Sequence, residues 1–136
     1  MATMIFMNIP VKDLDRSKAF FAALGYTFNP QFSNERGACM VVSDTIFYML
    51  LTEPFFKSFI DKEVADATKA NECINCLSVE SREGVDEVIA KAKVAGARIP
   101  EEPTDYGFMY SQGFEDLDGH LWNYVWMDPN GKPEHQ

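Results

Sequence analysis

Basic residues are scarce in this chain. Its 136 residues include 12 Lys and Arg against 21 Asp and Glu, so the formal net charge at pH 7 is −9. Binding to a nucleic-acid backbone or to an anionic membrane surface relies on clusters of Lys and Arg. A membrane-spanning helix needs roughly 20 successive apolar residues, and the sequence has no such run. We therefore predict neither a nucleic-acid nor a membrane partner.

Cysteine and histidine are also scarce. The cysteines are Cys39, Cys73 and Cys76, and an odd number cannot pair completely within one chain. The first residues lack the basic and apolar segments of a secretory signal. Together these features predict a reducing, cytoplasmic location. Of the two histidines, His120 lies in the body of the chain, and His135 lies in a polar tail that we expect to be disordered.

The first half of the chain has the pattern of a strand, a helix and three further strands. Asp13 or Asp15 offers an N-cap for the helix, whose apolar residues recur at helical spacing. Gly25 follows as a natural helix stop. The expected strands are 4–11, 26–28, 39–43 and 45–51.

The second half repeats this order. Ser81 is the expected N-cap of a second helix, and Gly96 ends it as Gly25 ends the first. Asp118-Gly119 is a favourable turn dipeptide between the last two strands. The expected strands are 73–79, 97–99, 107–115 and 121–127.

These repeats predict one domain made of two modules. Its parts are module one at 4–51, a linker at 52–72 with a short helix at 53–60, module two at 73–127 and a tail at 128–136. The composition, with 46% hydrophobic and 24% charged residues, is that of a globular domain. The expected fold class is α+β, with two βαβββ modules forming a curved mixed sheet around a cavity and the helices on its outer face.

The last expected strand is apolar on both faces. Alternation puts Trp122, Tyr124 and Trp126 on one face. Leu121 and Val125, with Asn123 between them, lie on the other face. This pattern is typical of a strand that is covered on both sides.

Two segments resemble the module signatures of the vicinal oxygen chelate superfamily, which contains glyoxalase I, bleomycin-resistance proteins and extradiol dioxygenases. They are NIPVKDLDRSKAFFAALGYTF and FEDLDGHLWNYVWMDP, and the resemblance extends from Met4 to Pro129. It implies a pair of βαβββ units that curl around a cavity, usually in a homodimer. The 7 methionines and 11 phenylalanines also favour a dimer interface.

Enzymes of this superfamily hold a divalent metal with His, Gln or Glu. By motif match these positions fall on Asn8, Tyr48, Cys76 and Asn123, where Asn8 replaces the usual His and Asn123 the usual Glu. Tyr48 and Cys76 are placed by aligning the two modules. Ni, Mn, Fe or Zn would need charged carboxylates or imidazoles, which amides and a phenol do not supply. The resemblance therefore implies a cavity without a metal cofactor, and the candidate ligand-binding residues are Asn8, Tyr48, Cys76, Asn123, Phe6, Phe108 and Tyr110.

Two further patterns suggest metal chemistry but have simpler interpretations. The spacing of Cys73 and Cys76 suits a zinc or redox site, but no second pair is present, and we interpret them as buried structural cysteines. Residues 115–120 resemble part of a calcium loop without its later Glu. We interpret them as a turn capped by Asp side chains, with a structural or surface role for His120.

Aromatic residues could wall the cavity. The superfamily often uses the region of Tyr106, Phe108, Met109 and Tyr110 as a cavity wall or lid. Phe55, Phe56 and Phe59 of the linker could close the same cavity. Ordinary core or dimer contacts are the alternative for both groups.

Three functions remain open. The first is a metal-free protein that binds a small organic molecule, with a cationic ligand favoured by the negative charge. The second is a divergent divalent-metal-dependent lyase or dioxygenase with shifted ligands. The third is a decayed site kept for an interaction or scaffold role. The pool of shifted ligands is Glu53, Glu115, His120, Tyr48 and Cys76.

Overall fold

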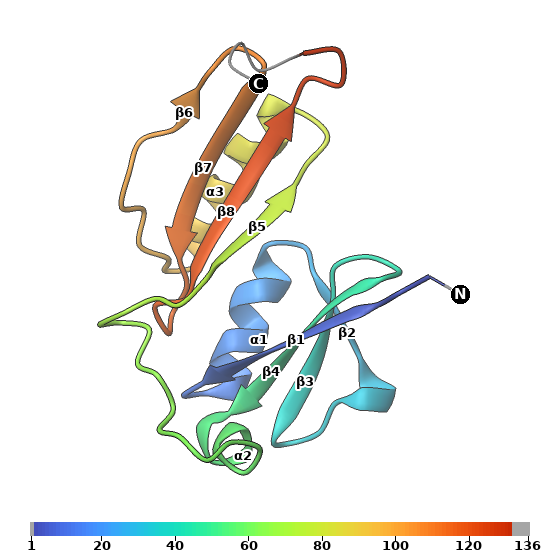
Figure 1. The fold of residues 1–136 in the computed structure, drawn as a ribbon, viewed down its shortest axis with the longest axis vertical. Coiled ribbons are helices and arrows are strands. Elements are labelled where there is room, and N and C mark those ends of the chain that lie inside the picture. The colour runs from blue at the N-terminus through green and yellow to red at the C-terminus, as the bar shows by residue number, and fades with distance from the viewer. Residues whose placement is uncertain (1, 132–136) are drawn as a thin grey trace. The chain divides into compact units, whose positions relative to one another are not determined.

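The chain folds as two compact units, residues 1–65 and 66–136, and the computed structural model describes residues 2–131 (Figure 1). The first unit contains β1 (Ile5–Val11), α1 (Leu14–Ala23), β2 (Thr27–Asn29), the 3-10 helix η1 (Pro30–Phe32), β3 (Gly37–Val41), β4 (Ile46–Thr52) and α2 (Glu53–Lys57). The second contains β5 (Ile74–Ser78), α3 (Arg82–Val94), β6 (Thr104–Asp105), β7 (Met109–Glu115) and β8 (Leu121–Met127). The tail beyond Gly131, with His135, lies outside the described residues.

Each unit has one four-stranded mixed sheet. The strand orders are β1-β4-β3-β2 and β5-β8-β7-β6. In each sheet the first and last strands of the unit pair in parallel, and the other pairs are antiparallel. This confirms the predicted α+β class and the two βαβββ modules. The described strands form two sheets rather than one.

The caps of both long helices are the predicted ones. The Asp13 carboxylate accepts a hydrogen bond from the Arg16 backbone N–H at 3.1 Å, and the Ser81 hydroxyl accepts one from Gly84 at 3.0 Å. Such caps satisfy donors that the first helical turn leaves free. Gly25 and Gly96 follow the helices with φ of 106° and 107°, a left-handed conformation that only glycine adopts at little cost.

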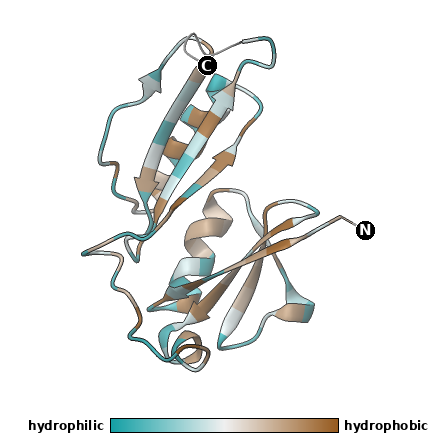
Figure 2. Cartoon of the chain, in the orientation of Figure 1, coloured by the Kyte–Doolittle hydropathy of each residue, from teal (hydrophilic) through white to brown (hydrophobic). Residues whose placement is uncertain are grey.

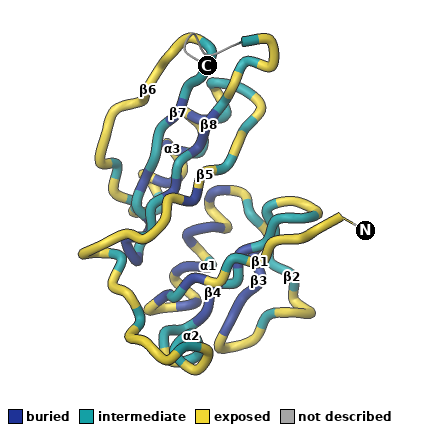
Figure 3. Tube along the Cα trace, viewed as in Figure 1, coloured by how far each residue is buried: buried dark blue, intermediate teal, exposed yellow. Residues whose placement is uncertain are grey.

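Each helix covers one face of its sheet. In the first unit, α1 buries Phe20 and Phe21, and the sheet buries Val11, Met40 and Leu50 (Figure 3). In the second unit, α3 buries Val85, Ile89 and Ala92, which gives the helix its alternating apolar and polar bands in Figure 2. The other face of each sheet is left without a long helix, and any cavity must be sought there.

The core of the second unit is built on aromatic rings. The Phe114 ring stacks on Trp122 and Tyr124, with centroid separations of 6.5 and 5.9 Å. All three side chains are at most 1% exposed. They lie on the face of the sheet that α3 covers, as the alternation along the last strand predicts. On the opposite face, Val125 is 8% exposed and Asn123 is half-buried, so that face is covered only in part within the unit.

The return strand of the second module differs from the prediction. The expected strand at 97–99 makes only an isolated bridge between Arg98 and Glu115, and β6 forms later, at Thr104–Asp105. Pro100 and Pro103 explain the interruption, because proline has no N–H to donate to a strand ladder. The linker helix is also shorter than predicted and ends at Lys57.

The turn before β8 is organised by one buried carboxylate. Asp116 accepts hydrogen bonds from the backbone N–H groups of Asp118 at 2.9 Å and His120 at 3.0 Å, and from Trp122 Nε1 at 2.9 Å. Burial raises the pKa of the Asp116 carboxyl. Gly119 adopts φ of 88° in this turn. The predicted Asp-capped turn is thus confirmed, and it anchors the core Trp122.

No helix among residues 2–131 is long and apolar enough to cross a membrane.

The substitution Asp116→Ala is expected to destabilise the chain by about 2–4 kcal/mol, because it leaves several buried donors without an acceptor. Urea unfolding followed by tryptophan fluorescence measures the loss. Asp44→Ala, in an exposed turn, is the matched control and should change stability by less than about 0.5 kcal/mol. Equal effects of the two substitutions would contradict a structural role for the Asp116 carboxylate.

Candidate functional site

The register of β1 against β4 decides which candidate residues share a face. Phe6 pairs with Phe47 and Asn8 pairs with Met49, so these four side chains lie on the face opposite α1. The Phe6 and Phe47 rings stack at 4.9 Å between centroids, and Phe6 is 49% exposed. Asn8 Nδ2 donates a hydrogen bond to the Phe6 carbonyl at 3.0 Å. Asn8 and Phe6 thus lie together on the open face of the first sheet.

Tyr48 lies on the other face, which corrects the predicted grouping. It pairs with Met7, is 5% exposed and shares the buried face with Leu50. In the second unit Cys76 pairs with Asn123. The residue of the first unit that corresponds to Asn123 is therefore Met49. The predicted alignment of the two modules, which matched Tyr48 with Asn123, is therefore wrong by one residue. A shift of one residue moves a side chain to the opposite face of a strand.

Cys76 and Asn123 are neighbours on the open face of the second sheet. Asn123 Nδ2 lies 3.9 Å from Cys76 Sγ. Cys73 and Cys76 are both exposed, so their interpretation as buried structural cysteines is wrong. Both lie at β5, which is an edge strand and has a neighbour on one side only. Cys39 is the buried cysteine, and burial raises the pKa of its thiol.

Tyr110 also faces away from Asn123. It pairs with Trp126 on the face that α3 covers, and its hydroxyl donates to Asp86 Oδ1 of that helix at 2.6 Å. This hydrogen bond raises the pKa of Tyr110. Tyr110, a candidate ligand-binding residue, is therefore not on the open face. Phe108 precedes β7, and its ring stacks on Tyr106 at 6.3 Å between centroids.

The linker phenylalanines contact the first unit. The Phe55 and Phe59 rings pack edge to face at 4.9 Å, and the Arg36 guanidinium lies 4.4 Å from the Phe55 centroid. Phe59 remains 67% exposed. At least Phe55 is thus part of ordinary packing against its own unit.

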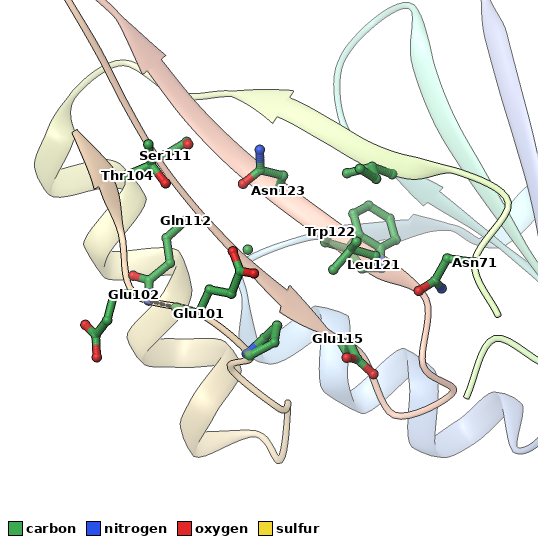
Figure 4. Close-up of a pocket in the computed structure, with 13 residues that line it drawn as sticks. Asn71, Glu101, Glu102, Thr104, Ser111, Gln112, Glu115, Leu121, Trp122 and Asn123 are labelled. Carbon is green, nitrogen blue, oxygen red and sulfur yellow. Dashed lines mark hydrogen bonds between the residues drawn. The ribbon is translucent and has the colours of Figure 1, made fainter. Parts of the chain in front are cut away.

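A cavity of about 460 Å³ opens on the open face of the second sheet (Figure 4). Its floor comes from β7 and β8, and one wall comes from the segment before β6. Asn123 is the one predicted site residue that lines it. The lining residues are Asn71, Ile74, Pro100, Glu101, Glu102, Thr104, Ser111, Gln112, Gly113, Glu115, Leu121, Trp122 and Asn123.

Small or polar side chains form the floor of this cavity. Ser111 and Gly113 alternate with large side chains along β7, and this alternation is a signal that sequence reasoning missed. Ser111 is 9% exposed, and its hydroxyl makes no hydrogen bond to another residue within 2–131. A Cβ at Gly113 would lie 2.7 Å from the Trp122 carbonyl oxygen and 3.5 Å from Asn123 Oδ1. Only glycine therefore fits there, and its missing side chain leaves the Asn123 amide uncovered.

Contacts with β7 hold the wall segment, residues 100–104, and the residues just before it in place. The Glu101 carbonyl accepts a hydrogen bond from Gln112 Nε2 at 3.0 Å. Arg98 forms an ion pair with Glu115 beside the backbone bridge that joins these two residues. In Figure 4 the Glu101 side chain points toward the strands, and that of Glu102 points away from them.

Arg82 ties β6 to the start of α3. Its guanidinium donates to both carboxylate oxygens of Asp105, at 2.7 and 3.0 Å, and to the Gly107 carbonyl at 3.0 Å. It also lies 5.1 Å from the ring centroids of both Tyr110 and Trp126. The hydrogen bond from Arg82 and a second one from the Gly107 N–H lower the pKa of Asp105 from 3.8 to about 2.

Arg82→Gln is expected to speed amide hydrogen exchange at Tyr106 and Gly107 by roughly threefold to fivefold, because the tether that orders this turn is lost. Since the pKa of Asp105 is lower in the folded chain, the tether stabilises above pH 3.8 and is lost as pH falls toward about 2. The difference between wild type and variant should shrink over that window. Arg16→Gln on α1 is the control, and unchanged exchange in Arg82→Gln would refute the tether.

The residues at the metal positions of the fold do not fit a divalent metal. They offer two amides, a thioether and a thiol, from Asn8, Asn123, Met49 and Cys76. Divalent metals in proteins are held mainly by carboxylates, imidazoles or several thiolates. Within residues 2–131, no three His, Cys, Asp or Glu side chains are grouped so that they could hold a metal ion.

The alternative ligands are also dispersed. Glu53 begins α2 in the first unit, and Tyr48 faces α1. In the second unit, Glu115 is paired with Arg98, and His120 belongs to the Asp116 turn. Within each unit, neither the members of this pool nor the motif positions bring together the charged ligands that a divalent metal needs, as far as residues 2–131 show.

Comparisons with known proteins agree with this architecture. A family model described as bleomycin resistance protein-like N-terminal matches residues 3–43. No curated protein sequence matches the chain significantly. Among solved structures, hypothetical protein SA1046 from S. aureus is 30% identical, with a TM-score of 0.78 over 93% of this chain and 95% of that chain.

Two further structures share the fold at lower identity. A glyoxalase/bleomycin resistance protein/dioxygenase family enzyme from Burkholderia phytofirmans PsJN is 14% identical, with a TM-score of 0.76 over 93% of this chain and 99% of that chain. The fosfomycin resistance protein FosX from Listeria monocytogenes is 20% identical, with a TM-score of 0.67 over 100% of this chain and 96% of that chain. With the paired βαβββ modules, these findings show that the chain has the fold of glyoxalase/bleomycin resistance protein/dioxygenase family structures and that its residues 3–43 match a bleomycin resistance protein-like domain.

Proposed function

We propose that this protein binds a small organic molecule, without a divalent metal, in the cavity on the open face of β7 and β8. One observation carries the proposal: a cavity of about 460 Å³ contains Asn123 at the position where the superfamily places a metal-binding Glu. Small-molecule sites have volumes of roughly 300–1,000 Å³.

The lining suits an organic ligand. Ile74, Pro100 and Leu121 supply apolar surface, and Ser111 and Asn123 supply hydrogen-bonding groups. Most of the other lining residues are also polar, among them Asn71, Thr104 and Gln112, and polar groups of this kind orient a small molecule in its site. The same residues offer no nucleophile activated by a neighbouring base, so binding is better supported than catalysis.

The structures that share this fold carry names of different kinds. FosX is a fosfomycin resistance protein, and the Burkholderia protein is described as an enzyme. Because a fold does not by itself fix an activity, the groups at the site have to decide between binding and catalysis. Here the metal positions that the resemblance implies hold two amides, a thioether and a thiol, which favours binding without metal over a divergent lyase or dioxygenase.

Two sequence-based expectations accompany this proposal. A homodimer follows from the superfamily resemblance and the apolar surface residues, of which Ile5 and Phe6 are about half exposed. Light scattering coupled to size-exclusion chromatography measures it. The cytoplasmic location follows from the cysteine content and stays a prediction.

Purified tag-free protein is expected to hold well below one metal ion per chain after incubation with Ni, Mn, Fe or Zn and desalting, because no charged ligand set converges. Plasma mass spectrometry of the protein solution gives the metal content directly. About one ion per chain of any of these metals would overturn the proposal of binding without a metal and favour a divergent metal-dependent lyase or dioxygenase.

Asn123→Leu is expected to abolish fragment binding in the cavity at little cost in stability, since its amide makes only a long contact with Cys76. A fragment screen by heteronuclear NMR should give shift changes that cluster on the backbone amides of Ser111, Gly113 and Asn123. Asn130→Leu, in an exposed turn, is the control and should keep the wild-type response. Fragment responses that avoid these amides, or that survive Asn123→Leu unchanged, would contradict the site.

A further inference from the structure

We propose that the ligand of this cavity carries an ammonium group and that Glu101 selects it. This inference rests on the proposed function and deepens it. It is drawn from the acceptors that face the cavity, from the pairing of the other charges and from one hydroxyl group of the floor that bonds to no other described residue.

Glu101 is placed to act on a ligand. Gln112 Nε2 donates to its backbone carbonyl at 3.0 Å and so holds this residue of the wall against β7. Its side chain points toward the strands that form the floor (Figure 4). Its carboxylate makes no ion pair with another residue within 2–131.

The other two carboxylates of the lining are less available to a ligand than that of Glu101. Glu115 is already ion-paired with Arg98, and the Glu102 side chain points away from the floor. The lining contains no Lys, Arg or His. A carboxylate in a cavity without a cation leaves a negative potential, which favours a positively charged ligand.

The floor supplies two further acceptors. Asn123 directs its Nδ2 toward Cys76 Sγ, and its Oδ1 lies 3.5 Å from the position that a Cβ of Gly113 would take. The amide oxygen is thus on the side of β7. Ser111 lies on the same face of the sheet, 9% exposed, with a hydroxyl that bonds to no other described residue.

These three groups match the hydrogen-bonding capacity of an ammonium ion. An ammonium group has N–H donors and no acceptor. The Glu101 carboxylate, Asn123 Oδ1 and Ser111 Oγ can all accept. The Ser111 hydroxyl bonds to no other described residue, and no fully buried side-chain oxygen among the described residues lacks a partner, so this hydroxyl is open to the cavity and can bond to a ligand or to water.

The apolar part of the lining defines the rest of the ligand. Ile74, Pro100 and Leu121 lie beside the polar floor and can cover a hydrocarbon body. The combination points to an alkyl or arylalkyl amine rather than to an anion or to a sugar.

The test uses three probes that share one aromatic body: phenethylamine, phenethyl alcohol and phenylacetate. Each is titrated into the full chain, and shifts of the Ser111, Gly113 and Asn123 amides are followed by NMR. The amine is expected to bind about fivefold more tightly than the alcohol, and phenylacetate should bind most weakly. Added salt should lower the affinity for the amine until it approaches that for the alcohol, and should leave the affinity for the alcohol unchanged.

Glu101→Gln should reduce the affinity for the amine by about fivefold and leave the alcohol unchanged. Glu102→Gln should have a smaller effect, because its side chain points away from the floor. Glu87→Gln, on an exposed position of α3, is the control that should change neither affinity.

The outcomes separate the two proposals. Equal binding of amine and alcohol at the cavity amides, or equal effects of Glu101→Gln and Glu87→Gln, would overturn the selection of a cation but keep the cavity as a binding site. No response of the cavity amides to any probe would count against both proposals.

Discussion

The parallel pairing between the first and last strands of each module is the interaction on which the site depends. It sets β1 against β4 and β5 against β8 with a defined register, in which Asn8 faces Met49 and Cys76 faces Asn123. Because side chains alternate across a strand, this register decides which residues lie beneath a helix and which lie on the open face. A shift of one residue would exchange the two sets and bury the amides among the core side chains.

The second unit shows how that division produces a cavity. On the helix-covered face, Phe114, Trp122 and Tyr124 stack into a core in which each side chain is at most 1% exposed. On the opposite face, Ser111 and Gly113 are too small to fill the space above β7. The Asp116 carboxylate fixes the turn between the two strands and holds Trp122 through its Nε1. The rigid aromatic core therefore supports a floor that is small, polar and partly open.

The charged groups of the cavity lie away from the metal positions that the superfamily resemblance implies. Asn8, Met49, Cys76 and Asn123 supply no carboxylate or imidazole, whereas the cavity lining holds Glu101 on the wall segment and Glu115 on β7. A carboxylate on an irregular wall can meet an organic cation, but alone it cannot hold a divalent metal. Similarity of fold to glyoxalase and fosfomycin resistance proteins thus coexists with a different set of donors.

The features that the sequence determined by itself are local ones. The caps at Asp13 and Ser81, the glycine stops and the Asp116 turn depend on contacts within a few residues, and pattern reasoning predicted them. The faces of Tyr48 and Tyr110 and the exposure of Cys76 depend on strand pairing between distant segments. The module alignment that matched Tyr48 with Asn123 was wrong by one residue, and the prediction that Cys76 is buried was also wrong. The wall at 100–104 was missed because two prolines displace the return strand. Only the tertiary structure decided these points, since register and edge position arise from partners that lie far away in the chain.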